Sequence, residues 1–311
     1  MPSVIPSYIE THRKGLLKEK KEAAYRILEA CTLCPRECRV NRRKGDLGIC
    51  KTADSAIVSS YAPHFGEESP LVGRHGSGTI FLTHCNLMCT FCQNYEISHE
   101  GEGSPVSHEE LAAMMICLQE MGCHNINFVT PTHVVPQILG ALEKAVEQGL
   151  SIPLVYNSGG YDRVSTLSLL EGVFDIYMPD FKFWDSEIAE KTCQAPDYPQ
   201  VAREALMEMH RQAGDLVIDN QGIASRGLLI RHLVLPHELA GTRKIMRFIA
   251  SRISKNSYVN IMPQYRPCGK AWEIQKLARP LTGPEYEKSL EDAAAEGIKR
   301  LDQRRRTFIT W

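Results

Sequence analysis

Residues 85–92 read Cys-Asn-Leu-Met-Cys-Thr-Phe-Cys, and this stretch decides the fold. It places Cys85, Cys89 and Cys92 at a C-x3-C-x2-C spacing, directly after the apolar run at 79–82. Thiolates are soft ligands that suit iron–sulfur clusters, zinc and Cu(I). A closed [4Fe–4S] cluster takes four cysteines. Because this loop offers three, the pattern predicts a cluster with one iron open to a small molecule. A structural zinc loop is the weaker interpretation, since zinc loops usually come as paired C-x2-C units.

Composition excludes several classes of protein. The chain has 311 residues, which allows one large barrel-type domain with an appendage. Its net charge of −1 gives no reason to expect a nucleic-acid or membrane partner. No apolar run approaches the ~18 residues of a membrane span, and the polar, basic beginning lacks the apolar core of a secretion signal. Many of the eleven cysteines stand at ligand spacing, so we expect a cytoplasmic protein whose cysteines serve metal binding rather than disulfides.

Four of these cysteines form a second group upstream, at Cys31, Cys34, Cys38 and Cys50. The Gly-, Pro- and Arg-containing segment around them can bury little apolar area, so it needs a cross-link to hold its shape. The C-x2-C spacing predicts a metal site, either structural zinc or a second iron–sulfur cluster. The alternative is a set of free thiols. A cluster would relay electrons and a zinc ion would hold shape, and the spacing does not decide between them.

Short apolar runs alternate with amphipathic stretches from residue 79 onward. The runs cover residues 79–83, 125–130, 152–157, 173–178, 228–235 and 257–262. Helices are expected at 13–29, 134–148, 198–212 and 241–254, with a closing helix at 283–302 and a short strand at 55–61. A capping box at Ser107 and Glu110 opens one more helix, and Gly122 ends it. Strands alternating with helices predict an α/β fold with a parallel sheet.

The cysteine loop, with Phe91 before its third cysteine, resembles the radical S-adenosylmethionine (SAM) enzymes. The resemblance implies that SAM occupies the open iron and is cleaved reductively to a 5′-deoxyadenosyl radical, which takes a hydrogen atom from a substrate. It also implies a partial (β/α)6 barrel of the TIM type, in keeping with six strands rather than eight. We expect a helix and a Cys-rich extension at 1–74 and the barrel at 75–311.

Ligands in such folds sit at the carboxyl ends of the strands, so the residues there are the candidates. After the second run, Thr130 and Thr132 could offer oxygens to the SAM amino group in place of a Gly-Gly-Glu stretch that many relatives carry. His133 follows and is left out of the catalytic set, because a packing histidine is at least as good an interpretation. Glu67 and Glu68, ahead of the barrel, could reach the active site, but a solvated loop pair is the favoured interpretation.

The next strand ends resemble those of pyruvate formate-lyase activating enzymes, where they contact SAM and a monovalent cation. Asn157 and Ser158 stand at the Asp and Thr of that pattern, and Asp180 and Lys182 match it directly. Asn157 lacks a charge, so a cation site here is expected to be weaker. Lys182 is a candidate partner of the SAM carboxylate. Arg231 lies inside an apolar strand and must pair with a carboxylate, of SAM or of Asp180.

The remaining cysteines and one tyrosine carry weaker expectations. Tyr265 replaces a histidine of the same pattern, and Cys268 is interpreted as a spectator. Cys117, Cys123 and Cys193 are interpreted as core or surface residues. No catalytic residue is assigned.

An uncharacterised branch of activase-like radical SAM proteins shares the Cys-x2-Cys-Pro-Arg-x-Cys stretch at 31–38. The first functional hypothesis is therefore an enzyme that activates a glycyl radical enzyme, using flavodoxin or ferredoxin as electron donor. The second is radical modification of a peptide side chain or a small metabolite. A third, from another class, is a non-catalytic metal-binding module.

Overall fold

The centre of the molecule is one open sheet, described by a computed structural model that covers residues 5–303. Its strands run in the order β10-β9-β8-β6-β5-β4-β2-β1-β3, with β7 paired to β8. They are β1 (Ala56–His64), β2 (Ser77–Leu82), β3 (Ser104–Val106), β4 (Ile126–Val129), β5 (Leu154–Ser158), β6 (Ile176–Pro179), β7 (Val217–Ile218), β8 (Ala224–Leu233), β9 (Tyr258–Met262) and β10 (Arg300–Leu301).

The six expected apolar runs form β2, β4, β5, β6, β8 and β9, which pair in parallel with one another. Every residue of β5, β6 and β9 is buried, as is typical of parallel strands covered on both faces. Strands β1 and β3 add an antiparallel edge beside β2. The sheet does not close, which confirms the partial barrel.

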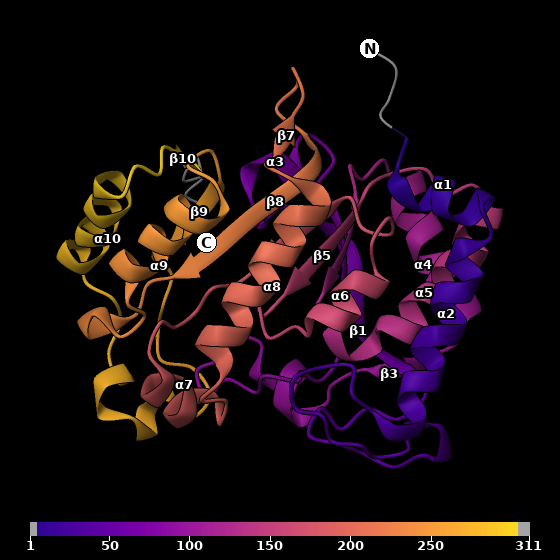
Figure 1. Cartoon of the computed structure of the whole chain (residues 1–311), viewed down its shortest axis with the longest axis horizontal. Helices are drawn as coiled ribbons and strands as arrows, with labels where there is room; N and C mark the ends of the chain where they lie inside the picture. Colours follow the sequence, from indigo (N-terminus) through magenta and orange to yellow (C-terminus); the bar gives the residue numbers. More distant parts are fainter. Residues whose placement is uncertain (1–4, 304–311) are drawn as a thin grey trace.

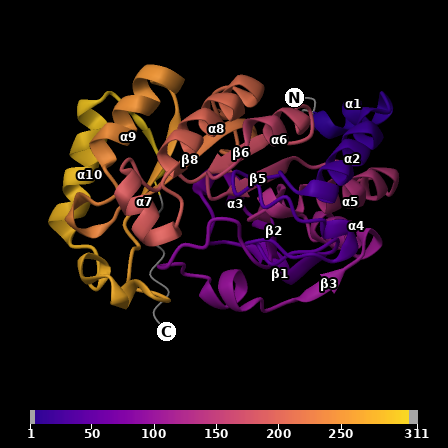
Figure 2. The ribbon, with the colours of Figure 1, turned by 60° about the horizontal axis from the view of Figure 1, so that its bottom comes forward.

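The helices cover the outside of the sheet. They are α1 (Ser7–Arg13), α2 (Leu16–Ile27), α3 (Ser69–Val72), α4 (His108–Glu120), α5 (Val135–Glu147), α6 (Val164–Leu169), α7 (Ser186–Cys193), α8 (Tyr198–Ala213), α9 (Thr242–Phe248) and α10 (Gly283–Ala295). Figures 1 and 2 show α1, α2, α4 and α5 grouped on one side of the molecule and α9 and α10 on the other.

Local signals in the sequence explain several boundaries. The Ser107 hydroxyl accepts the backbone N–H of Glu110, whose carboxylate accepts the N–H of Ser107, so the capping box of α4 is confirmed. The helix expected at 13–29 begins later, at Leu16, because Gly15 at φ +76° separates α2 from α1. The closing helix ends early at Ala295, before Gly297 at φ +86°, and the chain then adds β10 to the sheet.

The first helices are tied to the barrel by buried polar contacts. The Tyr8 hydroxyl donates to the carbonyl of Ile152, and the backbone N–H of Ser7 donates to Asp175. Strand β1 is part of the main sheet although the expected boundary at residue 74 places it in the extension. That boundary stays a prediction, and its outer ends, 1–4 and 304–311, lie outside the described residues. No helix within 5–303 is both long and apolar enough to cross a membrane.

Candidate active site

The cysteine loop leaves the carboxyl end of β2 in a strained backbone conformation. His84 and Met88 adopt φ +69° and +56°, in the left-handed region that non-glycine residues seldom occupy. The loop is fixed by hydrogen bonds to neighbouring segments: the Asn86 side chain donates to the carbonyl of Tyr161 at 2.8 Å, and the Thr90 N–H to the carbonyl of Thr192 at 2.9 Å. Strain maintained by surrounding contacts is typical of functional loops.

A cavity of about 470 Å³ opens over this loop. Volumes of this size are typical of small-ligand sites. Its lining includes the three loop cysteines and six expected cofactor-binding residues: Thr130, Asn157, Ser158, Asp180, Lys182 and Arg231. Thr132, the other threonine considered for the SAM amino group, is not in the lining and donates its hydroxyl to Asp162. The lining residues are far apart in the sequence and meet because each lies at or near the carboxyl end of a strand of the same parallel sheet. The structure thus brings the expected set to one place.

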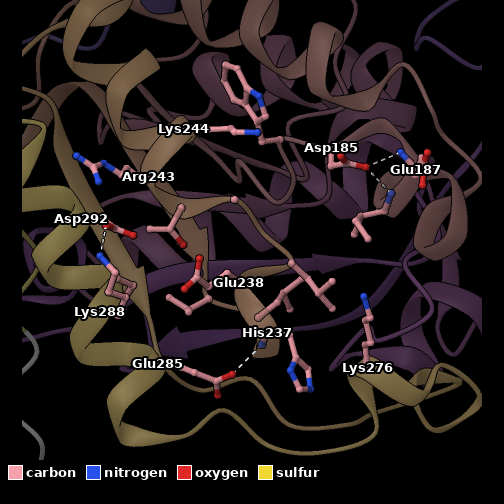
Figure 3. A pocket seen from close by; sticks show the side chains of 18 of the residues that line it. Asp185, Glu187, His237, Glu238, Arg243, Lys244, Lys276, Glu285, Lys288 and Asp292 are labelled. Carbon is pink, nitrogen blue, oxygen red and sulfur yellow. Dashed lines mark hydrogen bonds and ion pairs between the residues drawn. The ribbon is translucent and has the colours of Figure 1, made fainter.

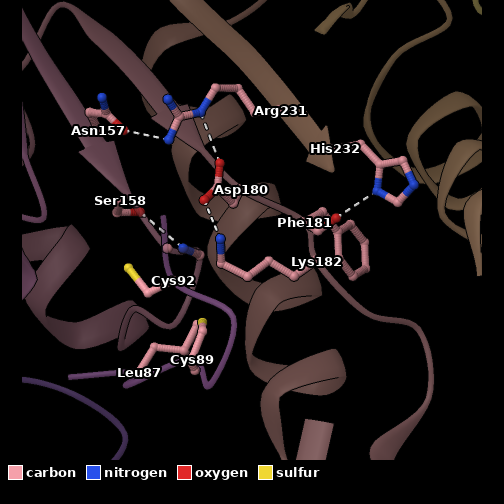
Figure 4. A network of polar contacts seen from close by, with 12 residues as sticks. Leu87, Cys89, Cys92, Asn157, Ser158, Asp180, Phe181, Lys182, Arg231 and His232 are labelled. Atoms are coloured by element: carbon pink, nitrogen blue, oxygen red, sulfur yellow. Dashed lines mark hydrogen bonds and ion pairs between the residues drawn. The ribbon is translucent and has the colours of Figure 1, made fainter. Parts of the chain in front are cut away.

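Three charged side chains, of Arg231, Asp180 and Lys182, form a hydrogen-bonded network in the cavity wall (Figure 4). Asp180 accepts Nε of Arg231 at 2.8 Å with one carboxylate oxygen and Nζ of Lys182 at 2.5 Å with the other. Burial alone would raise the pKa of Asp180, but Arg231 and Lys182 outweigh burial and lower it. Burial likewise opposes the charge of Lys182, and Asp180 and Cys89 raise its pKa nevertheless. All three groups are therefore ionised.

Arg231 also donates to Oδ1 of Asn157 at 2.6 Å. The amide oxygen considered for a monovalent cation thus already accepts from a guanidinium. The pairing of Arg231 with Asp180 is the one expected from the cost of a lone arginine in an apolar strand.

The two hydroxyl residues differ in what they offer a ligand. Thr130 lies at the end of β4 with φ +63°, an outlier for a β-branched residue, and faces the cavity. The Ser158 hydroxyl donates to the buried carboxylate of Asp162 at 2.5 Å, which also accepts Thr132 and Tyr156. Asp162 had not been identified, because a carboxylate four residues past a strand carries no motif.

Gly160 explains how the ends of β5 and β6 come together. It adopts φ +75°, and a Cβ there would lie 2.1 Å from the carbonyl oxygen of Asp180. The glycine thus brings the backbone of one strand end against the other.

The interpretation of Glu67 and Glu68 as a solvated pair is wrong. Both line the cavity, and Glu68 is only 1% exposed. Glu68 accepts Nδ2 of Asn260 at 2.8 Å, and Glu67 lies 3.9 Å from Arg231. The segment is drawn inward because its neighbouring strand β1 pairs with β2, which no local pattern showed.

Three residues left open by the sequence lie away from the lining of this cavity. His133 is buried, and its Nε2 is 2.9 Å from the carbonyl oxygen of Thr83. Burial lowers its pKa to about 3, so it stays neutral. The buried Tyr265 donates its hydroxyl to the carbonyl of Leu277, and Cys268 is not part of the lining.

Cys193 is the neighbour of the cluster loop that the sequence did not reveal. It is buried at the end of α7, and its sulfur lies 3.4 Å from that of Cys89. That hydrogen bond and burial raise the pKa of Cys89, and burial raises that of Cys85 to about 12. Metal must therefore displace protons from these thiols.

Three cysteines are a ligand set that suits an iron–sulfur cluster in which one iron has no protein ligand. Within residues 5–303 no three His, Cys, Asp or Glu side chains are grouped, as they lie, so that they could hold a metal ion.

A second cavity of about the same size, 450 Å³, lies between α7, α9 and α10 (Figure 3). It is lined by charged side chains such as Asp185, Lys244 and Glu285. None of the expected site residues borders it, so it is not the candidate site.

Comparison with known proteins identifies the class. A model of the radical SAM superfamily matches residues 79–247, more than half of the chain. Over 293 residues the chain is 34% identical to the uncharacterised protein MJ0674 of Methanocaldococcus jannaschii, covering 91% of this chain and 80% of that protein. The chain belongs to the radical SAM superfamily. Membership implies a [4Fe–4S] cluster, SAM (AdoMet) as the second cofactor and a reductant as electron donor.

Two solved structures are similar to part of the chain. Native anSMEcpe with bound AdoMet is 15% identical with a TM-score of 0.46, over 68% of this chain and 57% of that chain, less than two thirds of its length. Methylornithine synthase (PylB) is 16% identical with a TM-score of 0.45, over 91% and 70% of the two chains.

Replacing Asp180 with Asn leaves Lys182 and Arg231 without their shared counter-charge. We expect a loss of about 3–5 kcal/mol in unfolding free energy, because breaking a buried ion pair leaves a buried charge without a partner. Denaturant titration measures it. Glu171→Gln, which removes one of the two carboxylate partners of the exposed Arg211, is the control and should change little. Equal effects of the two substitutions would show that Asp180 does not hold the two cations.

Replacing Cys193 with Ala removes a hydrogen-bond donor from beside the Cys89 sulfur. Hydrogen bonds to ligand sulfurs stabilise the more negative, reduced cluster, so the reduction potential should fall. A redox titration followed by electron paramagnetic resonance measures it. Cys123→Ala, another buried cysteine, should leave the potential unchanged. A potential that is the same in all three proteins would refute the role of Cys193.

Proposed function

We propose that this protein is a radical SAM enzyme whose cluster is held by Cys85, Cys89 and Cys92. The observation that supports it is the single cavity in which these cysteines meet the buried charges of Asp180, Lys182 and Arg231. A structural metal module has no need of ionised groups facing a ligand-sized space. The non-catalytic alternative would leave their ionised, paired state unexplained.

The cofactors supply the electron transfer and the homolytic cleavage of SAM, and the protein supplies binding and orientation. Lys182, which is close enough to Cys89 for each to shift the other's pKa, offers a positive charge for the SAM carboxylate. Asp180 fixes the direction of that ammonium group and of Arg231. Thr130 faces the same space and offers oxygens for the SAM amino group. The buried walls exclude water from the reacting atoms.

A monovalent cation beside Asn157 and Asp180 would compete with the guanidinium of Arg231 for the same oxygens. Asn157 and Asp180 each already accept from Arg231. Two cationic side chains thus occupy the region that such an ion would enter, and they can take its electrostatic place.

The substrate we propose is a backbone glycine of a glycyl radical enzyme, with a flavodoxin or ferredoxin as electron donor. Support comes from the residues at the strand ends, since Asp180 and Lys182 match the pattern of pyruvate formate-lyase activating enzymes. A peptide side chain or a small metabolite is the alternative substrate class.

The reaction is tested with the anaerobically reconstituted protein, SAM and a low-potential reductant. We expect the cluster spectrum to shift on addition of SAM and 5′-deoxyadenosine to form. Cys89→Ala should abolish product, because the cluster loses one of its three protein ligands. Cys117→Ala, in α4, is the matched control and should keep it. Product formation by Cys89→Ala, or no spectral shift in the unaltered protein, would refute the assignment of the SAM-binding cluster to Cys85, Cys89 and Cys92.

The substrate class is tested by adding candidate glycyl radical enzymes to the active mixture. Abstraction from a glycine Cα should give a glycyl radical signal in electron paramagnetic resonance, and its yield should fall with Lys182→Ala if SAM is no longer positioned. Formation of 5′-deoxyadenosine with peptides or metabolites, and no glycyl signal with any partner, would favour the alternative class.

A further inference from the structure

The four upstream cysteines come together around a second, closed space. Cys31, Cys34, Cys38 and Cys50 all line one small cavity, although Cys50 is twelve residues past Cys38. Its volume is 10 Å³, about the room of one water molecule. The radical SAM match at 79–247 does not include these residues. They form a distinct group that the proposed reaction does not use.

Each of the four sulfurs accepts a hydrogen bond from the surrounding chain. The Ile49 N–H donates to Cys38 at 3.5 Å and the Arg42 guanidinium to Cys31 at 3.8 Å. The backbone of Arg36 bonds Cys34, and Thr52 bonds Cys50. Burial raises the pKa of Cys34 and Cys50 overall, and these hydrogen bonds oppose that effect because donors directed at sulfur favour the thiolate. Such donors are the usual surroundings of metal-bound cysteine.

The backbone is shaped to bring the sulfurs inward. Glu37, Arg39 and Lys51 adopt positive φ of 39°, 55° and 50°, each beside a cysteine of the group. A Cβ at Gly48 would lie 2.9 Å from the Cys38 sulfur, so only glycine lets that sulfur approach. Strain of this kind persists when something in the folded state compensates it.

The buried guanidinium of Arg42 places a positive charge beside the four cysteines. Its side chain is buried, and its guanidinium donates to the carbonyls of Ala53 and His133 and to the Cys31 sulfur. Among the described residues it makes no ion pair with a carboxylate. A buried cation without a counter-charge is costly. Four thiolates around a divalent ion carry a net charge of −2 and would provide that counter-charge.

Arg36 connects this group to the cluster loop. It lies between Cys34 and Cys38, and its guanidinium donates to the carbonyl oxygens of Asn86 at 3.0 Å and Leu87 at 3.2 Å. It also donates to the carbonyl of Cys193 at 2.6 Å. One side chain from the upstream segment thus holds the backbone between Cys85 and Cys89 and the residue beside the Cys89 sulfur.

We propose that Cys31, Cys34, Cys38 and Cys50 bind one zinc-type metal ion, which holds Arg36 against the loop that carries the catalytic cluster. The second part rests on the proposed function, and the first does not. A cavity with room for about one water molecule suits a single ion, and elemental analysis distinguishes that ion from a cluster of irons and sulfides. Among residues 5–303 the four side chains, as they lie, are not grouped so that they could hold an ion, so binding requires them to change rotamer.

The site is tested in the full chain with Cys85, Cys89 and Cys92 changed to Ala, which removes the catalytic cluster from the measurement. Elemental analysis should find about one zinc per chain, as in a tetrathiolate site. Changing Cys31, Cys34, Cys38 and Cys50 to Ala in addition should remove it. If that variant fails to fold, cobalt(II) added to the metal-free first variant should give the visible bands of a tetrahedral thiolate site. No metal and no such bands would overturn the proposal, as would iron and sulfide in place of zinc.

The link to the cluster loop is tested separately with Arg36→Ala. This variant should keep its zinc but lose cluster iron to a chelator about 10-fold faster, by analogy with other changes next to metal ligands. Arg39→Ala, an exposed arginine of the same segment, should behave like the unaltered protein. An unchanged rate for Arg36→Ala would overturn the bracing role. If the protein binds zinc but no iron–sulfur cluster, the proposed function fails and the zinc site stands.

Discussion

One buried carboxylate holds the active site together. Asp180 sits at the end of β6 and divides its two oxygens between Lys182 and Arg231, which come from the same strand end and from β8. Without Asp180, the positive charges of Lys182 and Arg231 would be buried in the cavity wall with no shared counter-charge, and neither side chain would be held in position. With it, the positive charge is directed at the cavity above the cysteine loop. The geometry of the site follows from this sharing, because Arg231 in turn fixes Asn157.

The cysteine loop is held from both sides. On one side lie the ends of the parallel strands, which supply the cavity wall. On the other side Arg36 and the end of α7 hold the loop backbone through carbonyl contacts. A loop whose backbone is strained at His84 and Met88 needs such support. The upstream segment therefore contacts the cysteine loop directly, although the superfamily match begins only at residue 79.

Much of the site could be predicted because parallel strands place their carboxyl ends together. Thr130, Asn157, Asp180, Lys182 and Arg231 were identifiable as strand ends and all line the cavity. Cys193 and Asp162 could not be found in this way. They approach the site through the packing of α7 and through a turn after β5, and neither carries a local pattern. Glu67 and Glu68 were placed in solvent for the same reason.

The sequence by itself determined the superfamily, the parallel sheet and the three cysteines of the cluster loop. Those features depend on short-range spacing and on apolar periodicity, which are local properties of the chain. Only the tertiary structure decided which charges pair, which sulfur lies beside Cys89, and that Arg36 reaches the cluster loop. Apart from the pair of Lys182 and Asp180, these contacts join residues fifty or more positions apart, and their geometry is set by how the helices pack on the sheet.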